Sequence, residues 1–365
     1  MIIFIFILVA VLCAGLTSAK KNEFFTDYMS PKNTTTVNAI FSVLIFLSHA
    51  VTYVKIGGAF DDPYLTLRQY LGQLVVVTYL FFSGYGIMES IKKKGTSYVR
   101  GMAKNRLFKL WYHFAIVLLG YTIVRIGIIG MKYSLKDYLL AYTGYTTIGN
   151  SNWYMFVTFA MYIIIIVSFL MFRKSNVLAL GLTCILTLLF GLFEDKMGLG
   201  SQYYNTVLTF PMGMVFSMIK PYVDKLLMKN DVFWFSGMFL SVFAFGYFAN
   251  NRTDSFMHYE LFVFFAIVML VVFMMKLNIK STILDWFGEH IFSFFILQRI
   301  PMLLLRHFGY NKNPYIFIIL CFIATVFLSV VYDEAMDKLD KIVFGKILKD
   351  KKTGSIYNLY FETNN

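Results

Sequence analysis

Charged residues are scarce in this chain of 365 residues, and acidic residues are the scarcest of them. Charged side chains make up 15% of the sequence, with 20 Asp and Glu against 33 Lys and Arg, whereas soluble domains carry about 25% charged residues. Hydrophobic residues make up 58%, and 40 of them are Phe. A soluble fold has no interior large enough for so much apolar surface, but a bilayer supplies apolar surroundings. The composition therefore excludes an ordinary soluble domain and predicts an all-α, polytopic integral membrane protein.

Cysteine is also rare, and this excludes a disulfide framework. Cys13, Cys184 and Cys321 all lie inside apolar runs, apart from one another. The five histidines fall on different predicted spans or loops without the spacing of metal ligands, so we expect no metal. The net charge of +13 resides in short basic clusters between apolar runs. Such clusters orient membrane proteins, so we expect the lipid bilayer as a partner and no nucleic acid.

The apolar runs predict about eleven transmembrane helices. The first resembles a signal peptide that ends at Thr17-Ser18-Ala19, but no basic residue precedes it, and Lys20 and Lys21 follow it. A signal peptide carries its positive charge on the other side, which favours a retained helix. We place the spans at residues 2–19, 37–54, 71–90, 107–129, 152–172, 176–193, 204–219, 232–250, 257–275, 283–305 and 313–332.

Basic residues predict the orientation of these spans. If Lys20 and Lys21 are cytoplasmic and the spans alternate, the cytoplasmic segments hold about three times as many Lys and Arg residues as the outer ones. The longest outer link is then the polar segment 131–151. This pattern predicts a multi-pass protein of the plasma membrane, with the N-terminus outside and the C-terminus in the cytoplasm.

Polar groups inside apolar spans are costly, and His49 is the first of them. An imidazole can accept or donate a proton near neutral pH. The residues alone leave two explanations open, which are a hydrogen bond to a neighbouring helix and proton-transfer chemistry.

A basic segment just before the fourth predicted span holds Arg100, Lys104, Arg106 and Lys109. Arg106 and Lys109 are three residues apart, so a helix would present both on one face. Such a pair can bind phosphates, Arg through its fork and Lys as a point charge. Ordinary anchoring at the cytoplasmic surface explains the same residues, and both interpretations remain open.

Three further polar segments interrupt the apolar runs. Small residues around Ser83 and Tyr85 allow close helix packing. Trp153 lies in an aromatic cluster that an interfacial belt would explain. Gln298 and Arg299 lie deeper in their span and are followed by Pro301, which kinks a helix. A buried Gln-Arg pair is typical of an internal polar network that lines a cavity.

Together these segments resemble the membrane acyltransferase type 3 family, the O-acyltransferases that modify bacterial cell-surface sugars. The resemblance covers roughly residues 30–335. It implies a ten-helix core at 30–335, an extra N-terminal helix with a short link at 1–29, and a basic, polar cytoplasmic tail at 336–365. The resemblance rests on Thr34-Thr35-Thr36, Ile45-Phe46-Leu47-Ser48-His49, Phe82-Ser83-Gly84-Tyr85-Gly86, Asn105-Arg106-Leu107-Phe108-Lys109, Asn152-Trp153-Tyr154 and Leu297-Gln298-Arg299.

The resemblance implies a mechanism. Acyl-CoA, usually acetyl-CoA, would bind from the cytoplasm with its phosphates at Arg106 and Lys109, joined by Arg100 or Lys104. The thioester would reach His49, which acts as a general base or transient acyl carrier. The acyl group would then pass to a hydroxyl of an extracytoplasmic glycan or other cell-surface acceptor. Residues expected along the passage are Asn38, Ser83, Tyr85, Trp153, Gln298 and Arg299.

One position departs from the family pattern, since Asn38 stands where the family often has Arg or Lys, eleven residues before the histidine. Two other functions compete with acyl transfer. One is a transporter or flippase of a polysaccharide precursor or small molecule, although transporters commonly show internal repeats and none is visible here. The other is a catalytically inactive relative that acts as a membrane partner.

Overall fold

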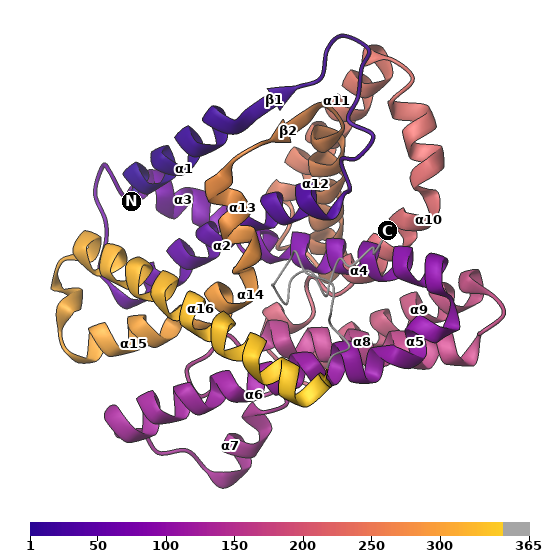
Figure 1. Ribbon diagram of the computed structural model, residues 1–365. Helices are drawn as coiled ribbons and strands as arrows, with labels where there is room; N and C mark the ends of the chain where they lie inside the picture. Colours follow the sequence, from indigo (N-terminus) through magenta and orange to yellow (C-terminus); the bar gives the residue numbers. More distant parts are fainter. Residues whose placement is uncertain (346–365) are drawn as a thin grey trace.

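The protein is built almost entirely of helices, as the composition predicts (Figure 1). The computed structural model describes residues 1–345, and the remainder of the predicted tail lies outside them. The helices are α1 (Ile2–Gly15), α2 (Pro31–Ala50), α3 (Asp62–Leu71), α4 (Leu74–Lys94), α5 (Thr96–Met102), α6 (Lys109–Thr122), α7 (Leu135–Ala141), α8 (Trp153–Met171), α9 (Asn176–Lys196), α10 (Thr209–Leu227), α11 (Asp231–Asn250), α12 (Phe256–Lys276), α13 (Thr282–Glu289), α14 (Ile291–Leu297), α15 (Arg299–His307) and α16 (Pro314–Phe344).

Besides the α-helices, the regular structure of the described residues consists of short 3₁₀ and π-helical segments and one pair of strands. The 3₁₀ turns are η1 (Val51–Tyr53), η4 (Ser201–Tyr203) and η5 (Tyr310–Lys312), and the π-helical segments are η2 (Ala103–Phe108) and η3 (Ile123–Ile128). The strands β1 (Leu16–Ser18) and β2 (Leu277–Ile279) pair antiparallel, with Leu16 opposite Ile279. This pair ties the end of α1 to the segment that follows α12.

Eight helical segments of the described chain are long and apolar enough to cross a membrane. The protein is therefore an all-α, multi-pass membrane protein, but the predicted count of eleven spans is not confirmed. Of the three other predicted spans, α1 has only 14 residues, α10 does not meet the same criterion, and residues 283–305 are divided among α13, α14 and α15. Eight segments qualify: Pro31–Tyr53, Asp62–Lys94, Thr96–Ile128, Trp153–Met171, Asn176–Lys196, Asp231–Asn250, Phe256–Lys276 and Pro314–Phe344.

Capping residues fix where many of the helices begin. At α2 the Ser30 side chain accepts a hydrogen bond from the Asn33 N–H, and Pro31 occupies the first helical position, where its missing N–H costs nothing. The Ser255 side chain caps α12 in the same way through the His258 N–H. Ser30 and Pro31 therefore fix where α2, the helix that carries His49, begins.

The most extensive helix pair is α4 with α10, and two glycines let their backbones meet. A Cβ on Gly84 would lie 2.0 Å from the Phe210 carbonyl oxygen, and a Cβ on Gly213 would lie 2.0 Å from the Phe81 carbonyl oxygen. No side chain fits at either position without separating the helices. This contact is the close packing that the small residues near Ser83 predict.

Replacing Gly84 with alanine is therefore expected to destabilise the protein by about 1–3 kcal/mol, the usual cost of overpacking. Gly246 on α11 is the matched control, because a Cβ there would meet nothing within 4 Å. Gly246→Ala is expected to leave stability unchanged or raise it by up to about 1 kcal/mol. Thermal unfolding in detergent measures both, and equal melting temperatures for the two variants would contradict the close-contact interpretation.

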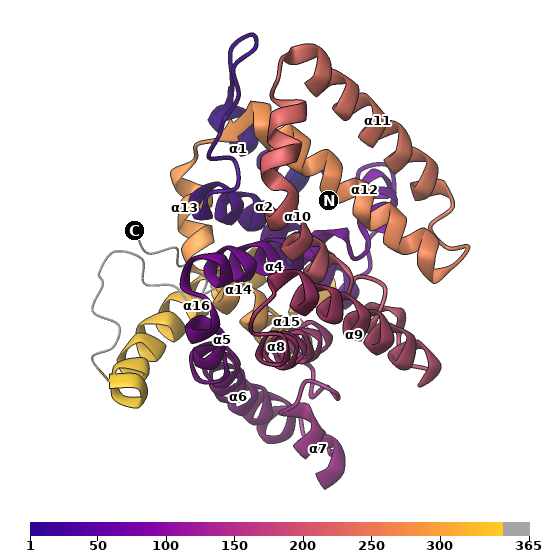
Figure 2. The same ribbon diagram turned by 90° about the vertical axis from the view of Figure 1, so that its right-hand side faces the viewer.

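Five helices from different parts of the sequence meet near the middle of the molecule. Helix α2 packs against α4, α13 and α14, and α14 packs along α16. Figures 1 and 2 show this central group, with the α11–α12 hairpin to one side and α7 at the opposite edge. Helix α16 continues to Phe344, beyond the predicted domain boundary at 335, so part of the predicted tail is helical.

Candidate functional site

His49 is the second-last residue of α2, at the end that orientation analysis predicts to face outward. Its Nδ1 atom is inaccessible to solvent and makes no hydrogen bond within the described residues. Gln298, Arg299 and Arg68 are the side chains close enough to interact with it electrostatically. A buried ring nitrogen without a protein partner can bind or exchange a proton with a substrate group.

The polar side chains beside His49 come from the break between α14 and α15. Gln298 is fully buried, and its Nε2 donates to the Phe295 carbonyl at 2.8 Å while its Oε1 has no hydrogen-bond partner. Pro301 follows on α15, and its ring removes one backbone N–H from the helix. The Tyr121 hydroxyl donates to the Ile296 carbonyl at 2.9 Å and supports the broken segment. The break thus brings Gln298 and Arg299 to the end of α2.

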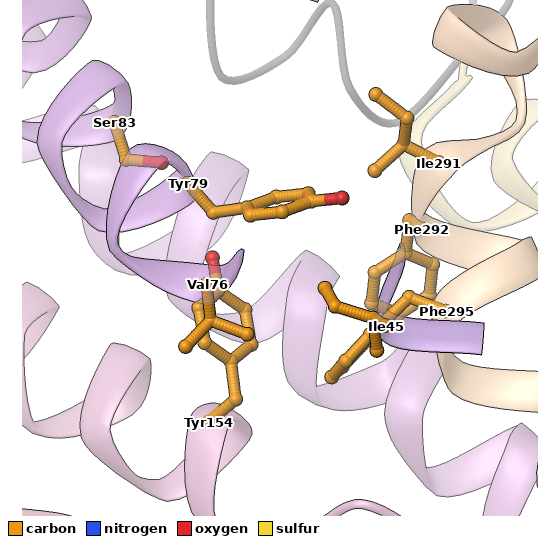
Figure 3. A pocket seen from close by; sticks show the side chains of 8 residues that line it. All are labelled: Ile45, Val76, Tyr79, Ser83, Tyr154, Ile291, Phe292 and Phe295. Atoms are coloured by element: carbon orange, nitrogen blue, oxygen red, sulfur yellow. The ribbon is translucent and has the colours of Figure 1, made fainter. Parts of the chain in front are cut away.

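A small, mainly apolar cavity lies between α2, α4, α8 and α14 (Figure 3). Its volume is about 20 Å³, which is room for about one water molecule. Two lining residues are close in the sequence to these polar side chains: Ile45 is one helical turn before His49, and Phe295 is three residues before Gln298. Its walls come from α2, α4, α8 and α14, and its lining residues are Ile45, Val76, Tyr79, Ser83, Tyr154, Ile291, Phe292 and Phe295.

Asn38 shares a face of α2 with His49. Eleven residues are close to three full turns, which separates the two side chains by about 16 Å along the helix. Asn38 is fully buried, and neither its side-chain nitrogen nor its oxygen has a hydrogen-bond partner within the described residues. Its carbonyl accepts a hydrogen bond of 2.8 Å from the hydroxyl of Tyr79, a residue that lines the cavity. Unsatisfied buried amides are costly, so this position has a reason beyond packing.

The basic segment divides into two buried and two exposed residues. Arg106 lies over the Tyr98 ring at 5.9 Å, whereas Lys109 makes an ion pair of 2.7 Å with Asp340 on α16. Both cations are almost fully buried, while Arg100 and Lys104 are exposed. Arg106 lies within the π-helical segment η2, whereas Lys109 is the first residue of α6. Arg106 and Lys109, which the sequence predicts to act together, therefore contact different elements, and the Asp340 carboxylate neutralises the Lys109 charge.

The remaining residues that the sequence predicts for the site differ in whether they line the cavity. Ser83 is part of its lining, whereas the Tyr85 ring packs on Phe216 of α10 at 6.0 Å. Trp153 begins α8, and the adjacent Tyr154, not Trp153, lines the cavity. Sequence reasoning missed Tyr154 although it belongs to the Asn-Trp-Tyr motif.

Asn152 fixes the start of α8 and so places Tyr154. Its Nδ2 donates to the Gly144 carbonyl at 2.7 Å and to the Tyr203 hydroxyl at 2.6 Å. Burial raises the pKa of Tyr203, so the phenol stays neutral and can donate in turn to the Tyr145 carbonyl. Asn152, a polar residue at the start of this span, therefore connects the beginning of α8 to the preceding loop and to Tyr203.

Two buried networks on α16 were also missed. Asp340 accepts from Lys109 and lies 2.9 Å from His113 Nε2. Asp333 lies 2.6 Å from His290 Nδ1 and accepts from the Ser293 hydroxyl at 2.6 Å. These groups lie far apart in the sequence, so no local motif could have joined them. Within residues 1–345 no group of three or more His, Cys, Asp or Glu side chains could hold a metal ion.

The fold and site define a multi-pass membrane protein with a half-buried histidine among polar side chains, one helical turn from a residue that lines a small cavity. A family model described as an acyltransferase domain matches residues 37–334, which is most of the chain. The chain therefore belongs to the acyltransferase type 3 family, as the sequence motifs predict. The reaction of this family is acyl transfer, so the protein is an acyltransferase by class. No curated protein and no solved structure matches it.

Proposed function

We propose that the protein is a membrane O-acyltransferase that moves an acyl group, and specifically acetyl, from cytoplasmic acyl-CoA to a hydroxyl of an extracytoplasmic glycan or other cell-surface acceptor. The observation that carries the proposal is the unpartnered Nδ1 of His49, buried next to Gln298 and Arg299 and one helical turn from the cavity. Membership of the acyltransferase family supports the reaction class.

In the proposed reaction, His49 accepts the proton of the acceptor hydroxyl. The hydroxyl oxygen attacks the thioester carbonyl, an ester bond forms and the carbon–sulfur bond breaks. The proton then passes from the imidazolium to the leaving sulfur, so that CoA leaves as a thiol and no net proton is consumed. The Arg299 guanidinium lies beside His49 and would stabilise the negative charge that develops on the carbonyl oxygen.

The cavity supports the choice of a short, uncharged acyl group. None of its lining residues carries a charge, and most are aliphatic or aromatic. A carboxylate at the end of a dicarboxylic acyl chain would lose its hydration there without gaining a cation. The uncharged, mostly apolar lining therefore favours a short, uncharged acyl group such as acetyl.

The basic segment supports binding of the CoA phosphates at the predicted cytoplasmic face. Arg106, with the exposed Arg100 and Lys104, offers positive charge at the start of the long α5–α6 segment. Lys109 is paired with Asp340, so its contribution to phosphate binding requires that pair to open. We assign it a supporting role.

The proposal is tested by release of CoA thiol from acetyl-CoA by the detergent-purified protein, with and without a cell-wall glycan fraction as acceptor. Acceptor-dependent thiol release supports acyl transfer. Glycan movement across sealed vesicles without thiol release would instead support the transporter alternative and overturn the proposal.

Filling the cavity is expected to block the reaction without touching His49. Ser83→Leu adds a branched side chain to a wall of a space of about 20 Å³, so we expect the turnover of acetyl-CoA to fall by at least about tenfold. Ser83→Ala adds no volume and is expected to keep most of the activity. If both variants are folded, by thermal unfolding, and Ser83→Leu turns over acetyl-CoA as fast as Ser83→Ala, the cavity is not on the acyl path.

A further inference from the structure

Four arginines gather around His49 and the neighbouring Tyr53. Arg299 and Arg68 interact electrostatically with His49, and Arg299 also interacts with Tyr53. The remaining two, Arg125 and Arg306, interact with Tyr53. These four arginines come from α3, η3 and α15, which are far apart in the sequence.

Several contacts hold these guanidinium groups in place. The Arg306 carbon Cζ lies over the Tyr53 ring, 5.8 Å from its centre. Arg125 donates from Nε to the Tyr133 hydroxyl at 2.9 Å, and Arg68 donates from Nε to the Ser48 hydroxyl at 3.0 Å. The Nε of Arg299 is buried and has no hydrogen-bond partner. Neutral groups therefore position the cluster, and the Nε of Arg299 remains available to a ligand.

None of the four arginines makes an ion pair with a carboxylate of residues 1–345. The ion pairs of the described chain involve other cations, namely Met1, Lys32, Lys92, Lys109, His113, Lys220, Lys276 and His290. Grouped cations repel one another, and the partial burial of Arg68, Arg125 and Arg299 makes that repulsion stronger than in water. An anion bound among them would remove the repulsion.

We infer that the arginines Arg68, Arg125, Arg299 and Arg306 bind an anionic group of the acceptor, and that this group is a phosphate. Guanidinium forks match phosphate oxygens in pairs, and a phosphate has enough oxygens to engage several arginines at once, whereas a carboxylate has two. The phosphate would hold the acceptor hydroxyl beside His49. This inference rests on the proposed function, because it names the acceptor chemistry of the same site.

The test is direct binding, which needs no turnover and so separates this inference from the proposed function. Calorimetry on the detergent-purified protein would measure affinity for glycerophosphoglycerol, inorganic pyrophosphate, glucuronate and glycerol. We expect both phosphate probes to bind more tightly than glucuronate, and glycerol not to bind. A preference for glycerophosphoglycerol indicates a polyol-phosphate polymer, and a preference for pyrophosphate indicates a diphosphate-linked lipid sugar.

Arginine variants locate the binding site. Arg306→Gln and Arg125→Gln are each expected to weaken the binding of the preferred phosphate probe roughly 10- to 100-fold. The matched control is Arg252→Gln, since Arg252 lies over the Tyr70 ring outside the cluster, and it is expected to bind like the unmodified protein. Unchanged affinity in both cluster variants would overturn the inference.

Two further outcomes would also overturn the inference. Tighter binding of glucuronate than of either phosphate probe would do so, because it would identify a carboxylate site. Loss of probe binding in the presence of adenosine 3′,5′-bisphosphate would assign the cluster to the phosphates of the donor instead of the acceptor.

Discussion

Replacing His49 with alanine is expected to lower acyl transfer by about 10²- to 10⁴-fold, the usual contribution of a positioned general base. The imidazole is the only proposed proton acceptor beside the cavity, and its Nδ1 has no other task in the described structure. Removing it leaves the donor site intact, because the basic segment contacts other elements. CoA binding, measured by calorimetry, is therefore expected to persist while thiol release is lost.

His258→Ala is the control for this result. His258 lies on α12 and is bonded to Ser255, and it does not line the cavity. Its replacement is expected to leave turnover close to that of the unmodified protein. If His49→Ala is folded and turns over acetyl-CoA as fast as His258→Ala, the role assigned to His49 is wrong.

The second large effect concerns Asp340. Asp340→Ala is expected to destabilise the protein by about 3–5 kcal/mol, the usual cost of leaving one partner of a buried ion pair without the other. Lys109 and Asp340 are both less than a tenth exposed, and His113 also bonds to the carboxylate. Removing the carboxylate leaves the lysine charge buried and uncompensated. Thermal unfolding in detergent measures the loss.

Asp337 provides the matched control, since it is an aspartate on the same helix, one turn earlier, and it is exposed. Asp337→Ala is expected to change stability by less than about 1 kcal/mol. Equal melting temperatures for the Asp337 and Asp340 variants would show that the Lys109–Asp340 pair is not a buried contact in the folded protein.

The sequence was sufficient to predict an all-α membrane protein and the helix that carries His49. Apolar runs identify membrane helices well because lipid leaves no other way to satisfy the backbone, and Ser30-Pro31 marks the start of α2 locally. The number of spans was harder to predict. An 18-residue apolar run need not form one helix, and residues 283–305 break at His290 and Gln298 instead.

The surroundings of His49 depended on contacts that no local pattern reveals. Asp340 and His113 are 227 residues apart, and the four arginines around His49 and Tyr53 come from three separate elements. Lys109 shows the consequence most clearly. Its spacing from Arg106 predicts a shared phosphate-binding face, but the structure pairs it with a carboxylate from α16.

The central claim is that an acyl group passes from CoA on one side of the membrane to a hydroxyl on the other, with His49 as the general base. The direct measurement uses sealed proteoliposomes with labelled acetyl-CoA added outside and glycerophosphoglycerol and chitotetraose trapped inside. The account predicts labelled ester on a trapped acceptor, and none with His49→Ala. Ester formation only when donor and acceptor share one side, or equal labelling with His49→Ala, would contradict it.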